Sequence, residues 1–269
     1  MLTENYAVRE NESLFKGYPR QPHPFMLGKQ GEHEFLFPTY FYKSRLMSAG
    51  FLCDFDVAKK MLPPGLRPLK VLPGKAVVGF TCYQHVQIAE MEPYNEAVIS
   101  IPSVRQNGTK IPFLPLLMEE KFRSFGHYVY HMPVNSQLNQ ARGEYIWGLP
   151  KVVAEVNFLS ENGMSICEVK QHEQLVFRLR VPMQGKATKF DRAMQVFSVL
   201  DEKLLSTESR VNALMQINKS PFKPDFAQVE LGDHMVAQRI AELGELTRCM
   251  ESRYTDDLRS ILSLPNTLV

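Results

Sequence analysis

The sequence predicts a β-rich fold, a single sandwich or barrel with a few helices, from three observations. Apolar residues alternate with polar ones in several short segments, which is the period of a strand with one buried face. Turn residues separate these segments, and no internal repeat, low-complexity tract or interdomain linker divides the chain. At 269 residues the chain is long enough to bury a substantial core.

The predicted strands are short alternating segments joined by turns. They are residues 78–86, 152–158, 175–181, 211–217 and 227–231. Asn162-Gly163 follows the second of them and precedes a further apolar segment at 166–169. Because Asn-Gly supplies the positive φ angles of a tight turn, we expect an antiparallel hairpin there.

Two segments have helical character. Residues 54–62 predict a short helix that ends at Pro63-Pro64, since consecutive prolines cannot continue the hydrogen-bond ladder. Residues 254–264 place Leu258, Ile261 and Leu262 at helical spacing before a proline and predict a terminal helix. Residues 191–206 fit a helix or a strand, and both readings stay open.

The first part of the chain differs from the rest. Residues 1–35 are polar, and Pro19, Pro22 and Pro24 interrupt any regular element. We expect an N-terminal arm laid over the body or over a neighbouring subunit, followed by one domain over residues 36–269.

The charge balance excludes several classes of partner. Lys and Arg number 31 against 29 Asp and Glu, so a net charge of +2 gives no electrostatic reason to bind nucleic acid or an anionic membrane. The most apolar stretch, Ile111 to Met118, is far shorter than the about 20 residues of a membrane span. With no apolar signal segment near residue 1, we expect a cytoplasmic protein whose partner is a small molecule.

The cysteines and histidines do not predict a metal site. The four cysteines lie far apart without a Cys-x-x-Cys pair and are expected to be reduced and buried. They are Cys53, Cys82, Cys167 and Cys249. His127 and His131 would share a strand face, but about 13 Å of backbone at roughly 3.3 Å per residue separates them. Motifs for nucleotides and for serine hydrolases are missing, so no metal or cofactor is expected.

The segment 141–152 contains the candidate nucleophile. A lone lysine after a proline is ordinarily a solvated surface charge. Lys151, however, lies between Trp147, Leu149 and Pro150 on one side and Val152 on the other, at the start of an apolar strand. This position could draw its amine inward.

Three motifs in order give this chain a recognisable pattern. Gly143 is followed seven residues later by Pro150-Lys151, Pro93 to Glu96 is followed by Ile101-Pro102, and Asp54-x-Asp56 leads into Leu62 to Leu66. Gly126-x-Tyr128 with Met132 extends the pattern. Over about residues 40–260 the chain thereby resembles the acetoacetate decarboxylase family.

The resemblance implies a fold and site residues. The fold would be the antiparallel β-barrel or sandwich of acetoacetate decarboxylase-like proteins, Lys151 the Schiff-base lysine and Glu96 the active-site carboxylate. Trp147 and Met132 would contact substrate, and family members are commonly homo-oligomers. The position aligned with the family's arginine is Ser44, so its neighbour Arg45 is the candidate for the substrate carboxylate only if the register slips by one.

The sequence also departs from the family pattern. Glu144-Tyr145 follow Gly143 where the family often has Arg-Glu, and Val152 replaces a second lysine. An insertion between Glu96 and Gly126 contains the apolar segment 111–118, which could be a lid over the pocket or a subunit contact.

The resemblance implies decarboxylation of a small β-keto acid, acetoacetate in the family, through a lysine Schiff base. The nucleophile must be a neutral amine, and burial alone lowers the pKa of a lysine by about three to five units. Two alternatives stay open. One is another Schiff-base reaction on a keto acid, as in an aldolase or dehydratase, and the other is a non-catalytic barrel that binds a small apolar ligand.

Overall fold

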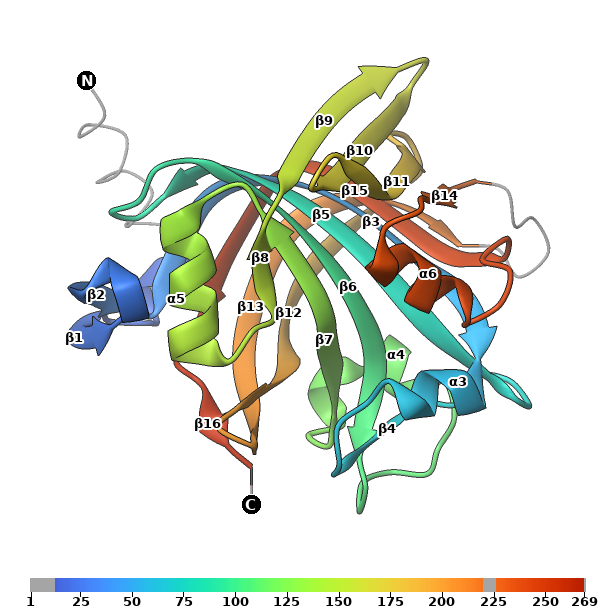
Figure 1. Cartoon of the computed structure of the whole chain (residues 1–269), viewed down its shortest axis with the longest axis horizontal. Helices are drawn as coiled ribbons and strands as arrows, with labels where there is room; N and C mark the ends of the chain where they lie inside the picture. The colour runs from blue at the N-terminus through green and yellow to red at the C-terminus, as the bar shows by residue number, and fades with distance from the viewer. Residues whose placement is uncertain (1–12, 220–225, 269) are drawn as a thin grey trace.

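Long strands that close into a barrel dominate the computed structural model, which describes residues 13–219 and 226–268 (Figure 1). Seven strands of this part of the chain form the closed ring β3-β5-β6-β7-β12-β13-β15. Their bounds are β3 (Thr39–Asp54), β5 (Lys75–Ile88), β6 (Tyr94–Arg105), β7 (Phe125–Val134), β12 (Lys186–Leu200), β13 (Lys203–Lys219) and β15 (Cys249–Leu262). Adjacent strands run antiparallel except β7 and β12, so the barrel is mixed rather than purely antiparallel.

A second sheet packs on the outside of the barrel. It has the order β14-β11-β10-β9 and lies over β3, β5 and β6, with the β9–β10 hairpin at the top of Figure 1. The bounds are β9 (Glu155–Glu161), β10 (Met164–Gln171), β11 (Gln174–Pro182) and β14 (Gln228–Leu231). The apolar residues of the two sheets form the largest buried cluster, in which the rings of Phe80 and Phe177 lie 5.1 Å apart.

Shorter strands complete the sheets. β4 (Leu66–Pro68) extends the barrel sheet beside β6, β8 (Lys151–Val153) pairs in parallel with β7, and β16 (Asn266–Thr267) pairs with β13. The β-rich fold class predicted from the sequence is therefore confirmed.

Most of the local predictions are confirmed too. The segments 78–86, 175–181 and 211–217 lie in strands and 227–231 corresponds to β14, but 152–158 is divided at Ala154 between β8 and β9, which belong to different sheets. Asn162 and Gly163 adopt φ angles of 49° and 77° at the β9–β10 turn. Helix α3 (Phe55–Lys60) occupies the segment predicted as a short helix. Its N-terminus is capped because the Asp54 carboxylate accepts hydrogen bonds from the backbone of Asp56 and Val57.

The predicted terminal helix over 254–264 is wrong, since most of this segment belongs to β15. The register of β15 on β3 shifts between Thr255 and Leu258 and again between Leu258 and Ser260. Each irregularity breaks the alternation, so apolar residues of one strand fall at a spacing that resembles a helix. The ambiguous segment 191–206 is also strand, in β12 and the start of β13.

The expectation that residues 1–35 lack regular structure is wrong for the described residues. They contain α2 (Ser13–Lys16), β1 (Gln21–Met26), the 3-10 turn η1 (Gly28–Gln30) and most of β2 (Glu32–Phe37). Pro22 and Pro24 are tolerated because β1 pairs only with β2, and an edge strand can lack donors on its free side. The boundary expected at residue 36 falls inside β2, and residues 1–12 lie outside the described part of the chain.

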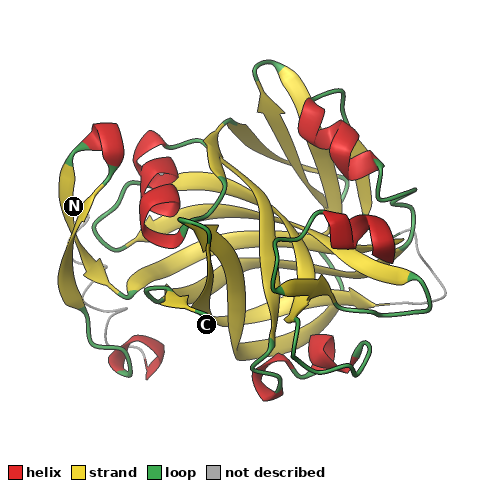
Figure 2. Ribbon diagram, turned by 60° about the horizontal axis from the view of Figure 1, so that its bottom comes forward, coloured by secondary structure: helices red, strands yellow, loops and turns green. Residues whose placement is uncertain are grey.

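Helices cover the ends and sides of the barrel (Figure 2). Beyond α3 they are α4 (Leu114–Leu117), the 3-10 turn η2 (Glu119–Lys121), α5 (Gln137–Trp147) and α6 (Met235–Ala241). Helix α5 connects β7 to β8 and packs against the β1–β2 hairpin, which lies beside it in Figure 1. The sequence patterns did not predict α5, and this helix positions the candidate site.

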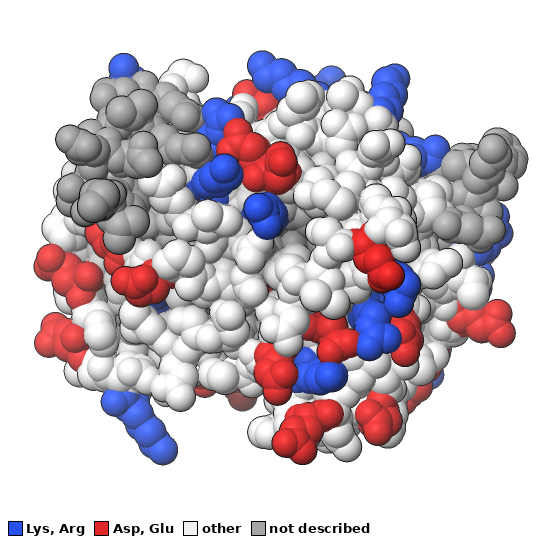
Figure 3. All heavy atoms as spheres, turned by 90° about the horizontal axis from the view of Figure 1, so that it is seen from above, with Lys and Arg blue, Asp and Glu red and all other residues white. Residues whose placement is uncertain are grey.

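Cysteines and surface charges fit the sequence analysis. All four cysteines are free and buried, as predicted. On the face shown in Figure 3, positive side chains stand beside negative ones at several places, and uncharged surface occupies most of the view. No helix within the described residues is long and apolar enough to cross a membrane.

The packing of the outer sheet on the barrel gives a stability prediction. Leu179 on β11 is fully buried in the shared core, whereas Leu159 on β9 is 62% exposed. Leu179→Ala is expected to lower the free energy of unfolding by about 2 to 5 kcal/mol, through lost burial and the cavity left behind. Leu159→Ala, the matched control, should change it by at most about 0.5 kcal/mol. Urea denaturation measures both, and equal values for the two variants would contradict this packing.

Candidate functional site

The barrel encloses a cavity of about 480 Å³. Buried side chains from β3, β5, β6 and β7 close one end of the cavity. At the other end it is lined by Phe113 and Leu117, which are partly exposed, and by Lys219. The cavity therefore has a closed, buried end and an accessible one.

Lys151 is the first residue of β8 and pairs with Met132 of β7. Lys151 is not itself part of the cavity lining, but Glu96, Met132 and Leu149 beside it line the closed end. Helix α5 stops at Gly148, whose φ of 60° is the left-handed conformation of a C-terminal glycine. After Gly148 the chain enters β8, which pairs in parallel with β7 and begins at Lys151. The prediction that Lys151 starts a strand is therefore confirmed.

Gly143 on α5 makes room for the lysine side chain. A Cβ atom at this position would lie 2.3 Å from Cδ and 2.7 Å from Cε of Lys151, so any larger residue collides with the lysine stem. The constant spacing between the glycine and the Pro-Lys pair thus has a steric cause. The helix must pass directly over the lysine.

The Lys151 amine is paired with the Glu96 carboxylate. Nζ donates a hydrogen bond to Oε2 at 2.6 Å, and both side chains are less than a tenth exposed. Nζ also lies 5.5 Å from the ring centroid of Tyr94. Glu96 stands near the start of β6, which pairs with β7, so closure of the barrel brings residues 55 positions apart into contact.

The environment keeps Glu96 ionised. Burial by itself would raise the pKa of Glu96, but the charge of Lys151, the hydrogen bond from its amine and the nearby His85 ring outweigh burial and lower the pKa to about 2. Burial raises the pKa of Tyr94 well above 10, and the Glu96 charge adds to this effect. At neutral pH the site therefore holds a carboxylate beside a protonated phenol.

His85 and Ser44 join this pair, and the sequence patterns did not identify either as a site residue. Ser44 Oγ lies 2.8 Å from His85 Nδ1, and His85 Nε2 lies 3.8 Å from Glu96 Oε1. Burial lowers the pKa of His85, although Glu96 opposes the shift, so the ring is neutral at pH 7. Within the described chain Nε2 has no hydrogen-bond partner, and His85 lines the cavity.

The other predicted site residues fall in different places. Met132 lines the cavity. Trp147 is buried outside its lining, where Nε1 donates to the Ser263 carbonyl at 2.8 Å and holds α5 against the end of the chain. Arg45 is exposed and donates to Gln84 at 3.1 Å, so the structure does not bring it to Lys151. Its neighbour Ser44 is buried and contacts His85.

The apolar segment 111–118 contributes to the cavity wall. Phe113, Leu116 and Leu117, in and beside α4, line its accessible end. This placement fits the lid that was one of the two readings of the segment.

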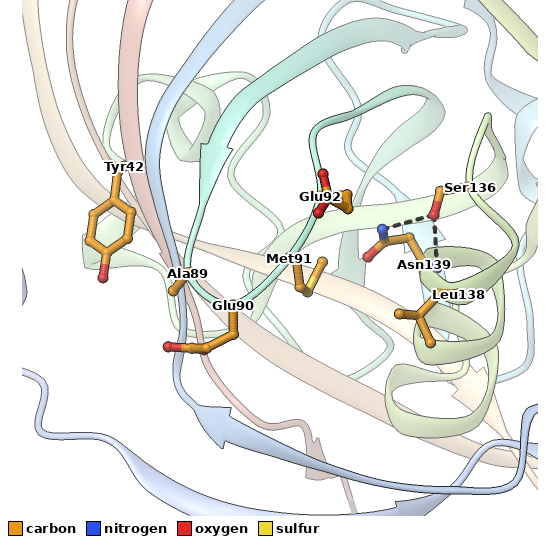
Figure 4. A pocket seen from close by; sticks show the side chains of 8 residues that line it. All are labelled: Tyr42, Ala89, Glu90, Met91, Glu92, Ser136, Leu138 and Asn139. Carbon is orange, nitrogen blue, oxygen red and sulfur yellow. Dashed lines mark hydrogen bonds between the residues drawn. The ribbon is translucent and has the colours of Figure 1, made fainter. Parts of the chain in front are cut away.

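A second hollow lies beside α5 (Figure 4). Glu90, Met91 and Glu92 line one side of it, and Ser136 and Asn139 at the start of α5 line another. The backbone nitrogen and Nδ2 of Asn139 both donate to Ser136 Oγ. Its described lining contains no lysine, histidine or cysteine. The barrel cavity is therefore the candidate active site.

Comparison with known proteins agrees with the motifs. A family model described as acetoacetate decarboxylase (ADC) matches residues 22–236. No curated protein sequence matches the chain.

Several solved structures share the fold at low sequence identity. The crystal structure of acetoacetate decarboxylase from Legionella pneumophila has a TM-score of 0.61 and 15% identity, over 98% of this chain and 95% of that one. The enduracididine biosynthesis enzyme MppR complexed with pyruvate has a TM-score of 0.60 and 14% identity, over 86% and 90%. An acetoacetate decarboxylase-like enzyme from Sphingomonas wittichii RW1 has 0.54 and 16%, over 86% and 93%. At these identities the similarity shows the fold alone.

The buried pair predicts a pH dependence of stability. The folded-state pKa of Glu96, about 2, lies below its ordinary value of 4.5, so the contribution of Glu96 is present above about pH 4.5 and is lost as the pH falls toward about 2. In Glu96→Gln this contribution is missing, and the free energy of unfolding should fall less steeply over the same window. Urea denaturation of both proteins at several pH values measures the slopes. Equal slopes would show that Glu96 is not held ionised by the site.

Proposed function

The chain belongs to the acetoacetate decarboxylase family, and from this premise we propose that it decarboxylates a β-keto acid through a Schiff base on Lys151. One observation carries the proposal. The Lys151 amine is buried and lies 2.6 Å from the carboxylate of Glu96, which holds it in place and itself lines the enclosed cavity. A lysine on the solvent-facing surface would have neither the enclosure nor the fixed partner.

The reaction follows from the chemistry of an amine and a ketone. The ammonium group of the Lys151–Glu96 pair first gives up a proton, and the neutral amine adds to the ketone carbon to form a carbinolamine. The carbinolamine hydroxyl takes up a proton and leaves as water, and the product is a positively charged iminium. The bond to the carboxylate then breaks, CO2 leaves, and the electron pair moves through the new carbon–carbon double bond to the nitrogen. The enamine is protonated at carbon, and water hydrolyses the iminium to release a ketone and free Lys151.

Glu96 and His85 have complementary parts in this scheme. The Glu96 carboxylate orients the amine and faces the positive charge of the iminium as it forms. His85 Nε2, which lacks a protein partner, is available to hydrogen-bond the substrate oxygen that leaves as water. Ser44 holds the other ring nitrogen, and the rings of Phe41, Tyr83 and Tyr94 surround the imidazole with centroids 4.6 to 5.2 Å away.

The charges of the cavity favour decarboxylation over reactions that retain the carboxylate. Of the basic side chains in its described lining, Lys219 and Arg253 both pair with Glu251, and His127 Nε2 is 3.3 Å from Glu119 Oε2. A substrate carboxylate beside Lys151 would therefore be buried without a free cation. Burial of an unpaired charge is costly, and the departure of neutral CO2 relieves that cost.

One comparison favours a second candidate, an aldol-type condensation through the same iminium. MppR, a structural neighbour with 13% identity and a TM-score of 0.57, has been solved with the condensation product of pyruvate and imidazole 4-carboxaldehyde. The two candidates share the nucleophile and differ in the fate of the carboxylate. Release of CO2 from a β-keto acid selects the first, whereas consumption of pyruvate and an aldehyde without CO2 selects the second.

Chemical trapping tests the nucleophile itself. Sodium borohydride added with a β-keto acid should reduce the iminium to a stable amine, and mass spectrometry should locate the added mass on Lys151. Lys151→Arg should abolish the adduct and CO2 release, because a guanidinium is always protonated and cannot attack. Lys186→Arg, at an exposed lysine, is the matched control and should retain both. Turnover by Lys151→Arg would overturn the Schiff-base proposal. No adduct and no CO2 release by the unmodified protein would overturn it too, and would leave the non-catalytic binding role of the barrel open to test by ligand affinity.

A steric variant tests how closely the lysine must be placed. Gly143→Ala should favour helix formation by up to about 1 kcal/mol and yet push the Lys151 stem aside. A displacement on the order of 1 Å can cost about 100-fold in rate, so we expect a loss of this size in kcat/KM with no loss of folding stability. Gly17→Ala is the control, since the nearest atom to its Cβ would lie 4.0 Å away. Full activity of Gly143→Ala would show that the close passage of α5 is unimportant.

A further inference from the structure

We propose that the substrate is a β-keto acid with an extended apolar substituent, rather than acetoacetate with its single methyl group. This inference rests on the proposed function, because the keto acid head must meet Lys151. It concerns the remainder of the cavity, which the reaction at Lys151 and Glu96 does not use.

The cavity is much larger than a small keto acid requires. Its volume of about 480 Å³ falls within the roughly 300 to 1,000 Å³ of pockets that enclose drug-sized ligands. It is also elongated, since Glu96, Val98, Ser100 and Pro102 of β6 all line it. Six residues of strand at about 3.3 Å each span roughly 20 Å from the lysine end toward the accessible end.

Small residues keep the middle of the barrel open. Gly50, Gly79 and Ser100 are aligned neighbours across β3, β5 and β6, and Ser48 pairs with Thr81 one step nearer the lysine. All five line the cavity. An interior of this width is otherwise filled by side chains, so this band of small residues leaves space that a ligand can occupy.

The facing wall of the cavity is apolar. Residues from β7, β12, β13 and β15 supply aliphatic side chains to it. They are Val129, Met194, Val196, Val211 and Leu262. The charged groups of the lining are engaged with each other, as described for Glu251 and its two cations, so a polar substituent would find few free charged partners. An alkyl or aryl chain would bury its surface against this wall.

The accessible end of the cavity is also lined by apolar side chains. Phe113 and Leu117 line the cavity and are 40% and 46% exposed. Exposed apolar side chains beside a cavity mouth are costly in water and gain from contact with a ligand that reaches them. The insertion that contains them therefore fits a lid over the far end of the substrate.

A chain-length series tests the inference on the intact protein. Initial rates of CO2 release are measured for 3-oxobutanoate, 3-oxohexanoate, 3-oxooctanoate and 3-oxodecanoate, with borohydride trapping of each acid in parallel. We expect kcat/KM to rise about fourfold for each methylene buried, which amounts to roughly 200-fold between 3-oxobutanoate and 3-oxooctanoate. Trapping and turnover with the highest kcat/KM for 3-oxobutanoate would overturn the extended substrate and leave the proposed decarboxylation intact. No adduct and no CO2 from any of the acids would overturn both.

A matched pair of variants locates the chain in the barrel. Ser100→Leu narrows the band of small residues, and it should reduce kcat/KM for 3-oxooctanoate at least tenfold more than for 3-oxobutanoate. Ser160→Leu makes the same change at an exposed position of β9 and should leave the ratio of the two values unchanged. Equal losses for both acids in Ser100→Leu would contradict the placement. Should Ser100→Leu fail to fold, the series on the unmodified protein still decides the question.

Discussion

The site depends on one buried ion pair, between Lys151 and Glu96. Charges removed from water are costly unless a partner lies close and fixed, so the two side chains must arrive together. Pairing of β6 with β7 and of β7 with β8 brings them together, because these three neighbouring strands set the carboxylate and the amine on one side of the barrel. Helix α5 then completes the arrangement, because Gly143 on it leaves room for the lysine stem.

The sequence was sufficient for the fold class, the strands of the second sheet, β5 and β13 of the barrel, the Asn-Gly turn and the position of Lys151 at the start of a strand. These features depend on local chemistry, such as alternation, turn residues and the effect of proline. The pairing of Glu96 with Lys151 was inferred from family motifs and not from local pattern, because contacts between residues far apart in the chain leave no local trace. The place of α5 was missed for a related reason. Its buried face includes Asn139, Arg142 and Gly143, so the sequence of α5 lacks the apolar stripe by which a helix is predicted.

His85 shows why the rest of the site could not be inferred. On β5 the apolar residues Val78, Phe80 and Cys82 face the second sheet, and the more polar set that includes Thr81 and His85 faces the other way. In a single sheet that polar face would meet solvent. In this protein the sheet closes into a barrel, so the polar face of β5 lines the cavity instead of facing solvent. The same alternation separates Ser44 from Arg45, since neighbouring residues of a strand point to opposite sides.

The extent of pairing between neighbouring strands of the barrel is uneven. β12 and β13 are aligned over fifteen residue pairs, whereas β7 and β12 share two, Val196 with His127 and Phe197 with Tyr128. Sheets open first where the fewest main-chain hydrogen bonds must break. This seam adjoins Val129 and Val196, which line the cavity, so transient parting of two strands would widen the chamber sideways. β6 pairs with the opposite edge of β7, so the strand that carries Glu96 can stay in place while the cavity widens.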